Sequence, residues 1–361
     1  MKTRLPVREA ILNRKTYEAP AEGRAGKIRL DFNENTRGCG PAVLRALASL
    51  TPQQFGMYPE YQKPTARIAR HLGVRPDELL LTNGGDDALR VFFDTFVEPG
   101  SHILICEPTF PMYRYWGEIA GARIDVCRYD RQMKFPLEEA LVALGKKPRV
   151  FFLANPNNPT GTLVPPAALQ RLLRAARETV VVFDEAYAEF SGFSSLPWIR
   201  RHPNLFVART FSKAAGLAAL RLGVVIAAKQ SLEPVRRAMP PFPVNLAALV
   251  AAEAALRERK AIRRYVRDVQ RLRATCAKAL QELGATTYPS SGNFLLANFG
   301  PSGPALFATL EGKGILLRDR SKDMGPGFVR ITIGTSKEMH TLLREIRRNW
   351  NSRRRRDQGT T

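Results

Sequence analysis

The sequence predicts an α/β protein, with a mostly parallel seven-stranded sheet between helices and a smaller α+β domain after it. Two observations support this prediction. From about residue 78 to 228, short apolar runs bounded by Gly, Pro, Asn or Asp alternate with amphipathic stretches of helical period. Between Pro243 and Gly284, in contrast, the chain is rich in Ala, Leu, Arg and Glu and contains neither Pro nor Gly. The alternation is typical of parallel strands joined by crossover helices, and the later stretch marks a change of architecture.

The seven apolar runs are short and contain many β-branched residues, as expected of strands that are buried on both faces of a sheet. The stretches between them are long enough to form the helices of parallel crossovers. The predicted strands span residues 79–81, 103–106, 123–126, 150–154, 180–183, 205–208 and 223–227.

The smaller domain is predicted from the C-terminal third of the chain. Residues 245–283 read as one long helix or two close ones, and Pro240, Pro241 and Pro243 form a plausible hinge before them. Strands follow at 291–298, 315–318 and 328–333, with helices at about 302–312 and 336–349. We therefore divide the chain into an N-terminal arm that includes part of the small domain (1–40), a large domain (41–243), a small domain (244–350) and an Arg-rich tail expected to be disordered (351–361).

The charge balance is strongly basic, since 56 Lys and Arg residues face 33 Asp and Glu residues, for a formal net charge of +23. Such an excess favours acidic partners, and nucleic acid is the first candidate. However, the basic residues are spread along the chain, and they accompany no zinc-finger spacing, basic zipper or RNP-like motif. Solvated helix faces explain the excess better than a nucleic-acid site does.

The cysteines and the N-terminus limit the class of protein further. Four cysteines lie far apart, with no CxxC pair and no histidine cluster beside them, which argues against a metal site or a disulfide framework. The charged N-terminus lacks the apolar segment of a signal peptide, and no apolar run reaches the length of a membrane span. We expect a soluble cytoplasmic protein.

Five polar or mixed segments carry the candidate chemistry, four of them directly after predicted strands, where open parallel sheets place their ligand sites. They are 82–89 (TNGGDDAL), 155–161 (NPNNPTG), 183–187 (FDEAY), 210–213 (TFSK) and 328–335 (FVRITIGT). Taken singly, each has a structural explanation, respectively a turn, a loop of Asx turns, a helix cap, a surface lysine and an arginine paired with a structural carboxylate.

The residue types in these segments also suit one another chemically. The Gly84-Gly85 turn opens a predicted helix, whose free N–H groups can bind a phosphate. A partly desolvated Lys213 can serve as a Schiff-base nucleophile, and Arg221 can bind an anion. Arg330 lies among apolar residues and needs an anionic partner, either a structural carboxylate or the acid group of a substrate.

Together and in this order, the segments resemble the fold-type I aminotransferases that use pyridoxal 5′-phosphate (PLP), and most closely the histidinol-phosphate aminotransferase family. The resemblance covers about residues 17 to 348. It includes four further segments, namely 30–35 (LDFNEN), 58–61 (YPEY), 98–100 (EPG) and 108–113 (PTFPMY).

The resemblance implies roles around the cofactor ring. Lys213 would form the Schiff base with PLP and act as the general base, and Asp184 would pair with the ring nitrogen. Asn158 and Tyr187 would hydrogen-bond the phenolate oxygen of the ring, and Phe110 would stack on its face.

The resemblance also implies a phosphate site and a dimer. The cofactor phosphate would be held by Gly85, Asp86, Thr210, Ser212 and Arg221. Tyr58 would reach this phosphate from the neighbouring subunit, so the active unit would be a homodimer.

On the substrate side, the resemblance implies that Arg330 binds the α-carboxylate, or lies near the phosphate of an amino alcohol substrate. Arg318 matches the family's phosphate-binding arginine of the small domain, although it could equally end a surface strand. Tyr17 and Asn33 match residues near the substrate. Ala219 replaces a glycine that is usual in the family, a difference that bears on specificity more than on activity.

The expected reaction is PLP-dependent transamination of L-histidinol phosphate with 2-oxoglutarate, which yields imidazole acetol phosphate and L-glutamate in histidine biosynthesis. Relatives of the same fold that transaminate aromatic amino acids or decarboxylate phosphothreonine are the nearest alternatives. A nucleic-acid-binding protein on an aminotransferase scaffold is a third alternative, which the retained Lys213 and Asp184 disfavour.

Overall fold

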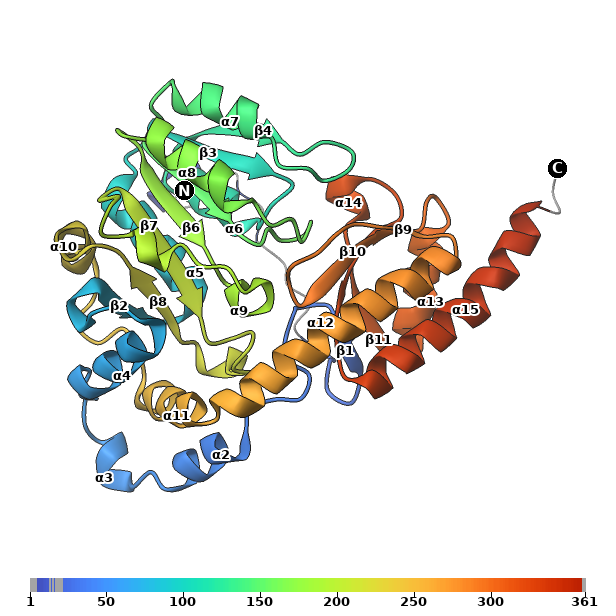
Figure 1. Ribbon diagram of the computed structural model, residues 1–361, viewed down its shortest axis with the longest axis horizontal. Helices are drawn as coiled ribbons and strands as arrows, with labels where there is room; N and C mark the ends of the chain where they lie inside the picture. Colours follow the sequence, from blue (N-terminus) through green and yellow to red (C-terminus); the bar gives the residue numbers. More distant parts are fainter. Residues whose placement is uncertain (1–4, 13, 15, 17–21, 359–361) are drawn as a thin grey trace.

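Two sheets organise the chain in this computed structural model, which describes residues 5–12, 14, 16 and 22–358, with side chains to residue 350 (Figure 1). The larger sheet has the strand order β2-β8-β7-β6-β5-β3-β4, and the smaller one has the order β1-β11-β12-β10-β9. The strands are β1 (Ile28–Leu30), β2 (Leu79–Thr82), β3 (His102–Glu107), β4 (Arg123–Arg128), β5 (Val150–Ala154), β6 (Val180–Asp184), β7 (Leu205–Thr210), β8 (Gly223–Ile226), β9 (Thr286–Thr287), β10 (Phe294–Asn298), β11 (Ile315–Asp319) and β12 (Phe328–Thr332).

Helices cover both sheets. They are α1 (Glu9–Leu12), α2 (Pro41–Ala48), α3 (Pro52–Phe55), α4 (Gln62–Leu72), α5 (Gly84–Phe96), α6 (Met112–Ile119), α7 (Leu137–Leu144), α8 (Pro166–Ala175), α9 (Ala188–Ser191), α10 (Lys229–Ala238), α11 (Leu246–Arg257), α12 (Arg259–Glu282), α13 (Gly303–Gly312), α14 (Ser321–Met324) and α15 (Ser336–Gln358). Short 3-10 helices occur at Pro76–Glu78, Leu196–Trp198 and Ala218–Leu220.

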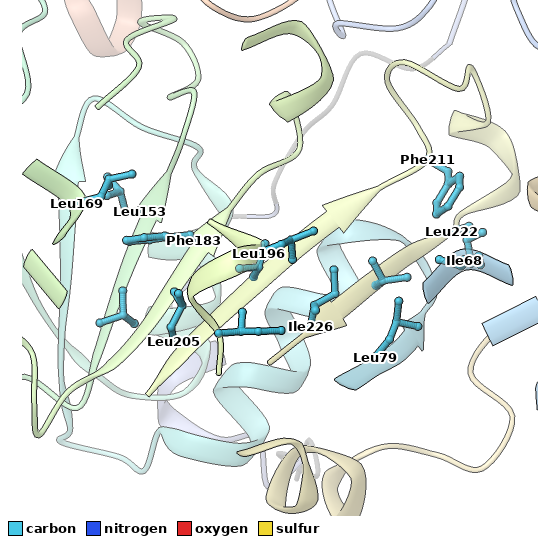
Figure 2. Close-up of a cluster of buried hydrophobic side chains, with 14 of the residues drawn as sticks. Ile68, Leu79, Leu153, Leu169, Phe183, Leu196, Leu205, Phe211, Leu222 and Ile226 are labelled. Carbon is cyan, nitrogen blue, oxygen red and sulfur yellow. The ribbon is translucent and has the colours of Figure 1, made fainter. Parts of the chain in front are cut away.

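The larger sheet confirms the predicted α/β class. Its strands run parallel except β8, which is antiparallel to both β2 and β7. All five residues of β5 are buried, because alternate side chains enter two different cores. Phe151 and Leu153 join a core formed with α4, α7, α8 and α11 (Figure 2), whereas Phe152 joins one formed with α5, α6 and α10.

The packing of α11 differs from the predicted domain boundary between residues 243 and 244. Ala248, Leu249 and Ala252 of α11 are buried in the core of the larger sheet. The next helix, α12, instead buries Tyr265, Val269 and Leu280 against the smaller sheet. We therefore propose a boundary at Glu258, between the two helices.

The small domain takes its first strand from the N-terminal part of the chain. β1 pairs in parallel with β11, while β9, β10, β11 and β12 form antiparallel pairs. Near the other end, Trp350 is buried and its Nε1 donates a 2.9 Å hydrogen bond to the Leu283 carbonyl. The backbone of α15 stays helical to Gln358, through the segment expected to be disordered, because arginine is a good helix former and no Pro or Gly precedes Gly359.

Membrane insertion finds no support in the helices. None of those in the described part of the chain combines the length and the apolar character that crossing a bilayer requires.

The larger sheet also places its polar segments together. β5, β6 and β7 are neighbouring parallel strands, with Ala154 opposite Asp184 and Asp184 opposite Ala208. The carboxyl ends of parallel strands meet at the same edge of a sheet, so the segments after residues 154, 184 and 210 share that edge.

The core beneath this edge can be tested at Phe152, which stacks on Phe93 with ring centroids 4.8 Å apart and on Tyr113 with centroids 5.5 Å apart. Phe152→Ala should lower the free energy of unfolding by about 3–5 kcal/mol, because it removes buried surface and leaves a cavity. Val142 is 70% exposed, so Val142→Ala is the matched control and should change stability by less than about 0.5 kcal/mol. Urea unfolding measures both, and equal midpoints for the two variants would contradict this packing.

Candidate active site

The amine of Lys213 lies in a protected position just beyond the end of β7. Its Nζ donates a 3.1 Å hydrogen bond to the carbonyl of Phe32 and lies 5.8 Å from the ring centroid of Tyr187. Burial, followed by the positive charge of Arg330, lowers the pKa of Lys213 to about 8. A substantial fraction of this amine is therefore neutral near physiological pH, as a nucleophile or general base requires.

Arg330 of β12 is a buried cation with only neutral partners. Its Nη1 donates a 2.6 Å hydrogen bond to Oδ1 of Asn158, and its Nη2 donates to the carbonyl of Asp31. Its Nε has no hydrogen-bond partner, and Arg330 forms no ion pair with any residue that the structure describes. Burial, together with the charges of Arg320 and Arg318, lowers the pKa of Arg330 to about 10. Such a guanidinium is suited to an anion that arrives from outside the chain.

Asp184 ends β6 and is held by two donors. The Tyr113 hydroxyl donates a 2.8 Å hydrogen bond to Oδ2, and the backbone N–H of Ala186 donates a 3.0 Å bond to Oδ1. Burial raises the pKa of Asp184 even though both donors favour the charged form. The sequence analysis assigned no role to Tyr113, although it lies three residues after Phe110, at a spacing that places both on one helix face.

The predicted phosphate site comes together around the start of α5. Asn83 places no side-chain cap on this helix, and Gly84 has a φ of +85°. A Cβ atom on Gly84 would lie 2.6 Å from Nη2 of Arg221, so only glycine allows this approach. The same Nη2 donates a 2.9 Å hydrogen bond to Oδ2 of Asp86.

Two hydroxyls complete this group. Thr210 Oγ1 donates a 2.9 Å hydrogen bond to Oγ of Ser212, and a Cβ atom on Gly85 would lie 3.9 Å from Cβ of Thr210. The helix start, the guanidinium and the hydroxyls thus form one anion-binding concavity.

Asn33 connects the N-terminal segment to both domains. Its Nδ2 donates a 2.9 Å hydrogen bond to the Tyr187 hydroxyl, and its backbone N–H donates a 2.9 Å bond to Oγ1 of Thr332. Asn33 is buried and has a φ of 55°, a backbone conformation that asparagine tolerates better than most residues. Phe110 lies nearby, edge-on to Tyr113 at 5.9 Å between ring centroids.

A second arginine lies beside Arg330. Arg318 of β11 is opposite Arg330 in the register of the two strands, and its Cζ lies 6.0 Å from the ring centroid of Phe32. Arg24 lies 4.1 Å from the same ring and forms ion pairs with Asp31 at 2.6 Å and Glu34 at 2.8 Å. The sequence gave no sign of Arg24, because these contacts depend on how the arm folds back on the small domain.

Two predicted residues are not brought into this group. Tyr17 lies outside the described residues. Tyr58 is 75% exposed, and its ring stacks on Phe242 with centroids 4.2 Å apart. Its predicted contact with a phosphate therefore requires a second subunit and stays a prediction.

The donor set fits PLP. Asp184 can face a protonated ring nitrogen, Lys213 can reach an aldehyde, and the uncapped start of α5 with Arg221 can hold a phosphate. The partnerless Nε of Arg330 leaves room for the anionic group of a second molecule beside the cofactor.

The lowered pKa of Lys213 makes a testable prediction for the protein stripped of cofactor. The fraction of unprotonated amine rises with pH, so acylation of Lys213 should reach half its maximal rate near pH 8 rather than near the value of about 10.4 found in peptides. Mass spectrometry of the peptide that contains Lys213 measures this rate. Arg330→Gln is the matched variant, and it should move the midpoint to higher pH because it removes the nearest repulsive charge. A midpoint near pH 10 in the unmodified chain would show that the amine is not desolvated.

Known proteins share both the sequence pattern and the fold. The aminotransferase class I and II family matches residues 25–346. Histidinol-phosphate aminotransferase of Geobacillus sp. (strain WCH70) is 35% identical over 327 residues, which cover 88% of this chain and 89% of that protein. Histidinol-phosphate aminotransferase 1 of Cupriavidus pinatubonensis is 35% identical over 334 residues, which cover 90% and 88% of the two chains.

A solved structure shares the fold as well. Histidinol-phosphate aminotransferase of Sinorhizobium meliloti, in complex with pyridoxal-5′-phosphate, superimposes with a TM-score of 0.89 at 24% identity, covering 97% of this chain and 99% of that one. By the family match and these relatives, the chain belongs to the class I and II aminotransferases and, within them, to the histidinol-phosphate aminotransferase family.

Proposed function

We propose that this protein transfers the amino group of L-histidinol phosphate to 2-oxoglutarate, forming imidazole acetol phosphate and L-glutamate in histidine biosynthesis. The proposal rests on the pairing of a desolvated amine, Lys213, with a buried guanidinium, Arg330, that has no anionic partner among the described residues. The names of the relatives supply the amino donor. The four cysteines are all free, which suits a reducing compartment, and we place the reaction in the cytoplasm.

PLP, when bound, supplies a carbonyl that captures amino groups and a cationic ring that accepts electrons from the substrate carbon. Lys213 would take the proton from that carbon and return it to the adjacent one, a task for which a pKa of about 8 is suitable. Asp184 would stabilise a proton on the ring nitrogen, and Tyr113 would hold Asp184 in place through its 2.8 Å hydrogen bond.

The other cofactor residues would position the ring. Asn158 and Tyr187 would bind its phenolate oxygen, and Phe110 would cover one face. The phosphate would be held by Gly85, Asp86, Thr210, Ser212 and Arg221, which already lie around the start of α5. Fixed contacts at both ends of the ring would keep the reacting carbon beside Lys213.

Substrate recognition would use the arginines of the small domain. A phosphate monoester carries close to two negative charges at neutral pH, and Arg318 and Arg330 offer two guanidinium groups on adjacent strands. A carboxylate, with one charge, would need only one of them. This pair favours histidinol phosphate over an aromatic amino acid, whereas phosphothreonine remains an alternative with the same phosphate chemistry.

The active unit would be a homodimer. Several large apolar side chains near α2, α3 and the segment after them are exposed, namely Leu44, Phe55, Met57, Tyr58 and Phe242. A second copy of the chain would cover them, and Tyr58 would then reach the cofactor phosphate of the neighbouring subunit.

A visible absorption spectrum of the PLP-loaded enzyme tests the proposed reaction, with single additions of L-histidinol phosphate, L-glutamate, L-phenylalanine and O-phospho-L-threonine. Histidinol phosphate and glutamate should bleach the yellow colour, and 2-oxoglutarate should restore it. Bleaching by phenylalanine alone would identify an aromatic aminotransferase. Release of carbon dioxide from phosphothreonine would identify a decarboxylase, and no cofactor colour at all would contradict an aminotransferase.

The phosphate site can be tested at Arg318. Arg318→Gln should raise the KM for histidinol phosphate about tenfold to a hundredfold, because a charge-assisted hydrogen bond is lost. The KM for glutamate should change much less, since its side chain carries no phosphate. Arg344 is 71% exposed on α15, and Arg344→Gln is the matched control with unchanged kinetics. Equal effects of Arg318→Gln on both amino donors would contradict a phosphate-binding role.

A further inference from the structure

A second cavity opens where the two domains meet, and the proposed reaction does not use it. Its volume is about 420 Å³, within the range of small-molecule sites. It lies between the end of α4, the segment 209–215 after β7, and the turn from α11 into α12. Thr210 borders it, but Lys213, Asp184 and Arg330 do not.

Positive charge dominates the walls of this cavity. Arg259, Arg263 and Arg267 follow one another at intervals of four residues, so they lie along one face of α12. None of the three forms an ion pair or side-chain hydrogen bond with another residue in the described part of the chain. Together they supply three guanidinium groups that are free to bind a ligand.

The fourth arginine of the cavity differs from these three. Arg209 is 9% exposed and is neutralised by two carboxylates, Glu185 at 2.9 Å and Glu189 at 3.2 Å. Of the two, only Glu189 borders the cavity. The positive charge of the cavity therefore comes from α12, and no acidic side chain on the cavity wall is left over to balance it.

His71 reports on the same charges from the opposite wall. Its Nδ1 is enclosed and has no hydrogen-bond partner among the described residues. Burial, followed by the charges of Arg259, Arg209 and Arg263, lowers the pKa of His71 to about 4. His71 is thus neutral at pH 7, and it offers a ligand a hydrogen bond without adding charge.

The rest of the lining is apolar, and it includes Leu72, Phe211, Leu256, Ile262 and Val266. Phe211 also belongs to the core of the larger sheet, where it lies near Leu222 (Figure 2). A ligand that fills this cavity would combine an apolar body with an anionic group directed at α12.

We propose that this cavity binds a phosphate monoester with an aromatic or aliphatic body. Three unpaired guanidinium groups match a dianion better than a single carboxylate, and the apolar walls exclude a bare inorganic ion as the best fit. Phe211, Ala214 and Ala215 flank Lys213 in the sequence and line the cavity. Its occupant therefore contacts the segment that positions the catalytic amine, whichever amino donor the enzyme uses.

Isothermal titration calorimetry of the PLP-loaded enzyme tests the proposal, with phenyl phosphate as the probe. Phenyl phosphate should bind at least about tenfold more tightly than benzoate, which has the ring but one charge, or inorganic phosphate, which lacks the ring. The double variant Arg263→Ala/Arg267→Ala should weaken this binding at least about tenfold and leave transamination intact. Arg264→Ala is the matched control, because Arg264 is on the same helix but does not line the cavity, and it should bind as the unmodified enzyme does.

The substrate site is the competing explanation, and Arg318→Gln distinguishes it. If phenyl phosphate binds in the cavity, Arg318→Gln should leave its affinity unchanged. Loss of binding in Arg318→Gln, or unchanged binding in Arg263→Ala/Arg267→Ala, would overturn the proposal. Equal affinities for phenyl phosphate and benzoate would overturn the assignment of the ligand as a phosphate ester.

Discussion

The burial of two cations in one site, Lys213 and Arg330, is the constraint on which the rest of the structure depends. Each loses favourable hydration, and the pKa values of about 8 and about 10 record that loss together with their mutual repulsion. A chain selected for stability alone would pair Arg330 with a carboxylate. The fold instead gives it an amide and a backbone carbonyl, which keeps its charge available for a substrate.

The architecture supports this arrangement from three directions. The larger sheet brings the ends of β5, β6 and β7 to one edge, where Asp184 and the segment with Lys213 follow. The small domain contributes Arg330 and Arg318 from adjacent strands. The N-terminal segment joins them, since Phe32 accepts a hydrogen bond from Lys213 and Asn33 bonds both Tyr187 and Thr332. Movement between the domains would therefore alter the surroundings of the amine directly.

Local patterns were enough to predict most of the fold. All seven strands of the larger sheet follow short apolar runs, because a strand covered on both faces leaves a continuous apolar signal. The boundary at residue 243 was harder to place, since the composition of α11 and α12 is similar and only packing separates them. The helical continuation of α15 to Gln358 was likewise hidden by the arginine run.

The site divides in the same way. Segments with fixed spacing, such as those around Asp184, Lys213 and Arg330, could be found from the sequence and from the resemblance that they support. The hydrogen bond of Tyr113 to Asp184 and the ion pairs of Arg24 could not, because they join residues whose proximity only the folded chain determines. The cavity beside α12 was equally invisible, since its arginines read as an ordinary solvated helix face.

The most direct test of the central claim is to treat the coloured enzyme with borohydride, which fixes a lysine–carbonyl linkage, and to map the modified peptide by mass spectrometry. We predict a single phosphopyridoxyl group on Lys213, and none in the Lys213→Ala variant. Modification of a different lysine, or of none, would contradict the assignment of the desolvated amine as the group that binds the cofactor.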